Sequence, residues 1–306
     1  MTLLAATTEW RNGGDYVQRF VVPGSPYVST VTSRLGAVAG VVYGADGIAR
    51  DIDGTTARQI PHCVAVEPPP AQASEMISAM SRERAVKPER VVIDLMELYT
   101  FAAENGAGGR APIEAKIAAA VDQLNTTLLQ SRIYNVSFRL VYTGRVDREE
   151  TLTQMQLLNW LSNDPGVVHL REEHAADLVG LWTEGDAEIA WAPREFRPSS
   201  GYHVICRRYA LSLQLFSHEV AHNLGAQHDT AQTGSVPNDP YPFARGICGE
   251  KSKTIMAYPP PGEWRETLPV FSSPELQPDG QADNARMIRL AGPIVADYFR
   301  AADKLK

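Results

Sequence analysis

The pattern of apolar and polar positions changes in character about a quarter of the way along the chain. Residues 15–60 have the pattern of short strands broken by turns; the valines of 36–44 favour β-structure, and an Ala-Asp-Gly turn follows them. The three consecutive prolines at 68–70 favour an extended, semi-rigid connection. The pattern predicts a small β-rich domain with a proline-rich linker over 1–85, followed by a second domain over 86–306.

In the second domain, predicted strands alternate with predicted helices. The near-continuous apolar run at 91–96 is typical of a buried strand, and the apolar residues of 112–130 recur at helical spacing, as in an amphipathic helix. Residues 136–142 alternate as in a strand with one buried face. The remaining elements that the pattern predicts are a helix near 150–162 and strands at 177–183 and 188–192. This alternation predicts an α/β fold, or more broadly α+β.

Composition and charge exclude some classes of function. The 306 residues are 44% hydrophobic and 21% charged, which is enough apolar material for a sizeable core. The net charge of -7 argues against a nucleic-acid partner, and we find no apolar run long enough to cross a bilayer. The first residues lack the basic start and apolar core of a secretory signal. A removed signal, another export route and retention inside the cell remain alternatives.

The segment 216–229, Phe-Ser-His-Glu-Val-Ala-His-Asn-Leu-Gly-Ala-Gln-His-Asp, has the spacing of a zinc site. His218 and His222 are four residues apart, so on a helix they lie on one face and can bind one zinc ion at roughly 2.0–2.1 Å. Glu219 lies beside this pair, where a general base for a zinc-activated water is needed. Apolar residues at helical spacing predict that this helix is buried and that Cys206 opens it.

Two further residues extend the motif and make it more specific. Gly225 permits a left-handed residue that ends the helix, and the turn lets His228 return to the same metal. Three neutral histidines leave the fourth position of a tetrahedral zinc ion open for water, which is typical of a catalytic site. Solvated histidines on a polar helix are the alternative, but three of the chain's seven histidines lie within these eleven residues.

These residues resemble the metzincin zinc peptidases, whose signature is this motif followed by a methionine turn. Thr254–Tyr258 (TIMAY) matches that turn, with Met256 placed 28 residues after His228. Asp229, directly after His228, is similar to the reprolysin (adamalysin-like) branch. The sequences FSSP at 271–274 and DNAR at 283–286 resemble bacterial reprolysin-like peptidases, including the peptidyl-Asp metalloendopeptidases. The resemblance covers roughly 90–302, and the first 85 residues resemble a metzincin propeptide only loosely.

The resemblance implies a fold and an activity. The catalytic domain would contain a twisted mixed sheet, an active-site helix, a methionine turn with Met256 as an apolar floor, and a closing helix near 284–301. One zinc ion would support hydrolysis of peptide bonds in a protein or peptide substrate, cutting on the amino side of acidic residues. The protein would be secreted or exported as a zymogen, with its own prodomain as intramolecular inhibitor. Calcium binding is possible, but no residue in the sequence supports it.

Tyr258 and the strand at 188–192 are less firmly placed by this resemblance. Tyr258 is similar to the tyrosine with which astacins and serralysins ligate zinc or stabilise the transition state; packing below the site is the alternative. Residues Ile189, Ala190 and Trp191 lie where metzincins present an edge strand to substrate, which would bind as an added strand. An interior strand is the alternative.

The three cysteines have two predicted roles. A disulfide between Cys206 and Cys248 would tie the loop before the methionine turn to the active-site helix, and two buried free thiols are the alternative. Cys63 lies at the end of the predicted propeptide, where metzincin zymogens often carry a cysteine whose thiolate occupies the open zinc position. His62 could be that ligand instead, or neither residue, since a small buried apolar role is common for a free cysteine.

Other functions remain open on the sequence alone. A zinc hydrolase of a small amide is one alternative, and an inactive protease fold that serves as a binding module is another, although the intact motif argues against the second. Arg245 and Arg265 are candidates for recognising an acidic substrate, by proximity in sequence only. The remaining histidines have no partner spacing and are expected on the surface or in the core: His169, His174 and His203.

Overall fold

The computed structural model describes residues 5–52, 64–68, 90–234, 239–277 and 281–303. Cys63 and His62 therefore lie outside the described residues. Within the described part, no helix is both long and apolar enough to cross a bilayer.

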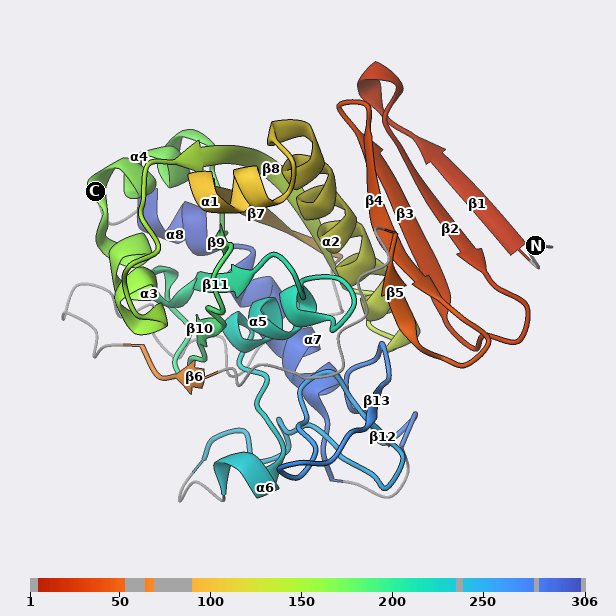
Figure 1. Ribbon diagram of the computed structural model, residues 1–306. Coiled ribbons are helices and arrows are strands. Elements are labelled where there is room, and N and C mark those ends of the chain that lie inside the picture. The colour runs from red at the N-terminus through yellow and green to blue at the C-terminus, as the bar shows by residue number, and fades with distance from the viewer. Residues whose placement is uncertain (1–4, 53–63, 69–89, 235–238, 278–280, 304–306) are drawn as a thin grey trace.

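The N-terminal residues form a five-stranded antiparallel sheet in which each strand pairs with the next (Figure 1). Its strands are β1 (Ala5–Trp10), β2 (Tyr16–Val21), β3 (Val28–Arg34), β4 (Ala37–Tyr43) and β5 (Ala49–Asp51). Only Leu35 and Gly36 connect β3 to β4, and both have positive φ, 51° and 78°. Such a turn matches the twist of the strands that it joins, so the hairpin closes tightly.

A second, six-stranded sheet lies at the centre of the molecule. In spatial order it contains β6 (Val64–Val66), β10 (Ile189–Trp191), β11 (Tyr202–Cys206), β9 (Leu178–Thr183), β7 (Val91–Thr100) and β8 (Val136–Val146). The pairs from β11 to β8 are parallel, whereas β10 is antiparallel to β11 and β6 is parallel to β10. The sheet is therefore mixed, as the resemblance implied.

Helices cover both faces of this sheet (Figure 1). One core packs α2 (Arg110–Gln130), α5 (Leu215–Asn223) and α7 (Asn284–Val295) against residues such as Ile93 and Trp182. The other packs α3 (Gln154–Asn163) and α4 (Pro165–Glu173) against residues such as Met96 and Leu181. Strands β7 and β9 contribute to both cores, which explains why their sequences read as continuous apolar runs. The chain also contains α1 (Phe101–Gly106), α6 (Thr230–Thr233), α8 (Tyr298–Asp303), β12 (Ser252–Lys253) and β13 (Glu266–Thr267).

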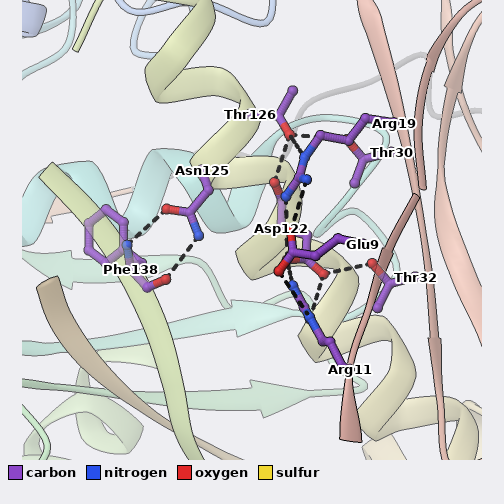
Figure 2. Close-up of polar contacts among 9 residues, drawn as sticks. All are labelled: Glu9, Arg11, Arg19, Thr30, Thr32, Asp122, Asn125, Thr126 and Phe138. Atoms are coloured by element: carbon purple, nitrogen blue, oxygen red, sulfur yellow. Dashed lines mark hydrogen bonds and ion pairs between the residues drawn. The ribbon is translucent and has the colours of Figure 1, made fainter. Parts of the chain in front are cut away.

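Helix α2 is buried along nearly its whole length because the N-terminal sheet packs on its polar side. Figure 2 shows the polar contacts at this junction. Asp122 on α2 is bound by Arg11, whose Nη1 lies 3.0 Å from Oδ2, and by the hydroxyl of Thr32 at 2.8 Å. The guanidinium of Arg19 donates to the hydroxyl of Thr126 at 3.2 Å. The polar residues of α2, which an amphipathic pattern would place in solvent, therefore face the N-terminal sheet.

Three expectations about the elements are wrong. The active-site helix begins at Leu215; Cys206 ends strand β11 instead, and turns separate the two. The predicted closing helix is two helices, α7 and α8, separated at Ala296 and Asp297. Strand β10 is not at the edge of its sheet in this state, because β6 pairs with its outer side.

Candidate metal centre

The short helix α5 places the first two histidines of the motif. Gln214 precedes it with a left-handed conformation, φ 58°, and all nine residues of the helix are buried. Gly225 follows it with φ 78°, and a Cβ atom there would lie 2.9 Å from Cζ of Phe196. A glycine is therefore required both by the backbone conformation and by the close packing. The turn at Gly225 brings His228 back to the helix.

The three histidines converge on one point. Their Nε2 atoms lie 3.1 Å apart for His218 and His222, 3.0 Å for His218 and His228, and 3.0 Å for His222 and His228. They form a group of buried side chains with ligand atoms close enough to hold one metal ion. All three come from one stretch of eleven residues, so local spacing alone brings them together.

Hydrogen bonds at the other ring nitrogens define what the Nε2 atoms can do. Nδ1 of His218 lies 2.9 Å from the carbonyl oxygen of Ile255, and Nδ1 of His222 lies 2.8 Å from that of Ala226. A carbonyl only accepts, so each Nδ1 is the donor and each Nε2 carries a lone pair. Lone pairs that face one another at this distance repel unless a cation lies between them. This donor set therefore fits zinc, which takes neutral imidazole ligands.

The burial of the site favours the neutral form of these rings. Burial, followed by the nearby His222 and His228, lowers the pKa of His218 well below its usual value. Burial also lowers the pKa of His222 to about 4. At neutral pH both imidazoles are therefore unprotonated and able to bind a metal. Glu219, one residue after His218 on the same helix, is fully buried.

The segment predicted as the methionine turn lies directly against the histidines. The chain turns at Thr254–Ala257, where the amide of Ala257 donates to the carbonyl of Thr254 at 3.0 Å, and Met256 is fully buried. Oδ2 of Asp229 accepts a hydrogen bond of 2.9 Å from the amide of Tyr258. The ring of Tyr258 packs edge-on against His228, with centroids 4.9 Å apart, and against His218 at 5.6 Å.

Asn223 is a residue of the site that the sequence did not single out. Its Nδ2 donates to the carbonyls of Trp191 and Tyr202 at 2.9 Å each, and its Oδ1 lies 3.0 Å from Nδ1 of His203. It therefore fixes the end of α5 to strands β10 and β11. Its signal in the sequence is weak: a polar residue directly after His222, at the end of the helix. His203, expected on the surface or in the core, is fully buried, and its Nε2 lies 3.3 Å from Glu97.

The predicted disulfide is wrong, because Cys206 and Cys248 are both free thiols. Cys206 ends β11 and its thiol faces the carbonyl of Glu184 at 3.8 Å, whereas the thiol of Cys248 faces the carbonyl of Gly249 at 3.7 Å. The prediction assumed that Cys206 opens the active-site helix. It lies instead in the central sheet, so the two segments do not converge.

The two arginines proposed to recognise acidic substrates both have carboxylate partners. Nη2 of Arg245 lies 2.7 Å from Oδ2 of Asp239, and Arg194 contacts the same oxygen at 2.7 Å. Arg265 pairs with Glu263 and donates from Nε to the carbonyl of Gly249 at 3.0 Å.

Comparison with known proteins places this fold and site. A model of metallo-peptidase family M12, of the reprolysin type, matches residues 91–263, from β7 to just beyond the methionine turn. The match spans more than half of the chain, which belongs to this family. The sequence is also 30% identical over 242 residues to a "Peptidyl-Asp metalloendopeptidase" of Pseudomonas aeruginosa, an alignment that covers 67% of this chain.

The sequence match covers only part of the relative, and the structural match is of low sequence identity. The alignment spans 40% of the length of the Pseudomonas relative, so the chain corresponds to less than half of that protein. A solved structure described as "Structure of a chaperone-substrate complex" matches 88% of this chain and 39% of its own, with a TM-score of 0.55 and 16% identity. At that identity the likeness concerns the fold alone.

Proposed function

We propose that this protein is a zinc-dependent endopeptidase with His218, His222 and His228 as its metal ligands. The observation that carries the proposal is the convergence of three buried Nε2 atoms on one point. Zinc, when bound there, supplies a Lewis acid that polarises the scissile carbonyl and lowers the pKa of water. Membership of the M12 metallopeptidases supports zinc as the metal.

Glu219 is the proposed general base. It accepts a proton from the attacking water and delivers it to the leaving amine, so no covalent intermediate with the protein is needed. Its place directly after His218, fully buried on the helix that holds two of the ligands, supports this role. Burial removes competing bulk water and strengthens the electrostatic interactions of the carboxylate with the reacting groups.

Tyr258 is proposed to stabilise the transition state. Its ring packs against both His218 and His228, and its backbone amide is held by Asp229. These contacts hold the ring beside the metal ligands, from where the hydroxyl could donate to developing charge on the carbonyl oxygen. They would also serve a packing role, so Tyr258→Phe with zinc intact is the discriminating variant. An unchanged kcat in that variant would rule out the catalytic role.

We further propose that the protein is made as a latent zymogen. Strand β6 (Val64–Val66) lies parallel to β10, and the carbonyl of Val66 accepts a hydrogen bond of 2.7 Å from the amide of Ala192. A peptide segment of the chain's own N-terminal region thus takes the place where a substrate strand is expected to add. This arrangement supports peptides, rather than small amides, as substrates. The proposed switch residue, Cys63, directly precedes β6 in the sequence and stays a prediction.

The preferred substrate is proposed to be a polypeptide cut beside acidic residues, outside the cell that makes the enzyme. The name of the Pseudomonas relative, a peptidyl-Asp metalloendopeptidase, supports the first part. Export is proposed because the sequence resembles the metzincin zymogens. The rival interpretation as an inactive binding module is disfavoured, because the three histidines and Glu219 are all in place.

The test is casein cleavage by the zinc-loaded protein, compared with the Glu219→Gln variant. We expect cleavage that a chelator abolishes and zinc restores, and a loss on the order of a thousandfold or more in Glu219→Gln with zinc content unchanged. The amide of glutamine has nearly the shape of the carboxylate but cannot accept the proton. Cleavage by Glu219→Gln at the rate of the unchanged protein would refute the proposed base.

A further inference from the structure

Lys253 is a buried cation beside the metal centre, and nothing in the proposed mechanism uses it. It belongs to β12, between the turn at Gly249 and the methionine turn, and is only 2% exposed. Its backbone is held on both sides: Lys253 pairs with Thr267 of β13 and forms a bridge with Cys248. The position of the side chain is therefore set by two neighbouring backbone segments.

The ammonium group of Lys253 points toward Tyr258. Its Nζ lies 5.8 Å from the centroid of that ring, whose edge contacts are with His218 and His228. One aromatic side chain thus separates the amine from two proposed zinc ligands. The charge of Lys253 also acts on the metal site. After burial and the neighbouring histidines, it is a further cause that lowers the pKa of His218.

No anion balances this charge in the described part of the chain. There, no carboxylate lies within ion-pair distance of Nζ, which contacts the ring of Tyr258, while Cys248 and Asp229 act on it only through their charge. Asp229, the carboxylate that acts on Lys253 through its charge, already accepts hydrogen bonds from the amides of Ala231 and Tyr258. Burial lowers the pKa of Lys253 to about 8, so the amine is still mostly protonated at neutral pH.

A buried ammonium group without a counterion is destabilising, and proteins rarely retain one without a function. The contrast with Arg245 and Arg265, which both have carboxylate partners, is informative. An acidic ligand that reached Lys253 would not have to displace an existing ion pair.

We propose that Lys253 determines specificity: its ammonium group binds the carboxylate of an acidic substrate side chain next to the scissile bond. This inference rests on the proposed endopeptidase function and names the residue that selects among its substrates. Tyr258 contacts both the amine and two of the histidines, so a side chain bound at Lys253 would lie next to the metal centre. The flexible methylene stem of lysine allows Nζ to move toward the incoming carboxylate.

The test compares two peptides that differ only in Asp or Asn on the carboxyl side of the bond that is cut. The full chain, incubated with zinc until any self-processing is complete, is assayed with both peptides beside its Lys253→Met and Arg265→Met variants. A charge-assisted hydrogen bond predicts that the unchanged protein prefers Asp by on the order of 10- to 100-fold in kcat/KM. In Lys253→Met we expect that ratio to fall to about one, with the rate on the Asn peptide retained.

Arg265→Met is the matched control, because it removes a nearby cation that already has a partner, and it should keep the preference. Thermal unfolding adds a readout independent of activity: Lys253→Met should be at least as stable as the unchanged protein, since it removes an unpaired buried charge. If the role of Lys253 were merely structural, Lys253→Met would instead be less stable than the unchanged protein and would cleave both the Asp and the Asn peptide more slowly, by the same factor.

The other outcomes are equally decisive. Retention of the Asp preference in Lys253→Met, or its loss in Arg265→Met alone, overturns the inference. If the unchanged protein cleaves both peptides equally, the inference fails and the endopeptidase function stands. If it cleaves neither these peptides nor casein, the proposed function fails and the inference fails with it.

Discussion

The carboxylate of Asp229 joins the end of the zinc motif to the methionine turn, because its Oδ2 accepts a hydrogen bond of 2.9 Å from the amide of Tyr258. Its Oδ1 accepts from the amide of Ala231 at 3.1 Å. Since Asp229 directly follows His228, the same residue fixes the third histidine and the ring that packs against it.

We therefore expect Asp229→Ala to weaken zinc binding by about 10- to 100-fold, as loss of an outer partner does at other metal sites. The variant leaves the buried amide of Tyr258 without an acceptor, which should also lower the free energy of unfolding by about 1–3 kcal/mol. Competition with a metallochromic chelator measures the affinity. Asp229→Asn keeps one acceptor oxygen, so its zinc affinity should lie between those of the unchanged protein and Asp229→Ala. An affinity unchanged in Asp229→Ala would show that His228 is positioned without it.

If the pairing of β6 with β10 keeps the enzyme latent, a substitution that breaks this pairing should raise its activity. The carbonyl of Val66 accepts from Ala192, and the N–H of a residue points to the same side of a strand as its carbonyl. Val66→Pro should therefore remove a donor that faces β10, whereas Ala65→Pro removes one that faces away.

We expect the Val66→Pro full chain to show faster casein cleavage, or faster self-processing, than the unchanged chain. The increase should be clearly larger than in Ala65→Pro. Equal rates in all three proteins would mean that β6 does not hold the enzyme latent.

Tyr43 of the N-terminal sheet reaches the start of the active-site helix. Its buried hydroxyl accepts a hydrogen bond from Nε2 of Gln214, the left-handed residue that precedes α5. Tyr43→Phe should lower the free energy of unfolding by about 1–2 kcal/mol, because the amide of Gln214 loses a buried partner. Chemical denaturation measures this change. Tyr16→Phe, which alters a partly exposed tyrosine of the same sheet, is the control and should change stability by much less. If the two variants lose equal stability, the contact with Gln214 contributes nothing specific.

Glu188, just before β10, predicts a pH dependence. Burial, with a contribution from Asp186, raises the pKa of Glu188 from 4.5 to about 8. The folded state therefore holds this proton more tightly than the unfolded state. The resulting stability is fully present below pH 4.5 and is lost as the pH rises through about 8.

Glu188→Gln removes this dependence, so its melting temperature relative to the unchanged protein should rise between pH 5 and pH 9. Calorimetry at the two pH values measures the difference. A gap between the two proteins that is the same at both values would contradict the assigned pKa.

The sequence could predict that the three histidines lie together, because local spacing determines it. Two histidines four apart share a helix face, and Gly225 supplies the left-handed turn that returns His228. The apolar run at 91–96 likewise became β7, since a strand covered on both faces has little choice of residue.

The failures arose where distant parts of the chain meet. Apolar residues continue at helical spacing before Leu215, but they lie in turns whose side chains pack into the core. The spacing therefore placed the start of α5 too early. The covering of β10 by β6 joins residues more than a hundred positions apart, which no local pattern reveals. Lys253 gave no signal either, because an isolated lysine in a sequence carries no information about its burial.

The most direct test of the account is X-ray absorption at the zinc edge of the purified full chain, with metal content measured on the same sample. We predict one zinc ion per chain with three imidazole nitrogen ligands at roughly 2.0–2.1 Å, and loss of that ion in His222→Ala. A sulfur atom as fourth ligand would further support Cys63 as the switch. A chain that binds no zinc, or a zinc ion with fewer than three imidazole ligands, would contradict the proposed metal centre.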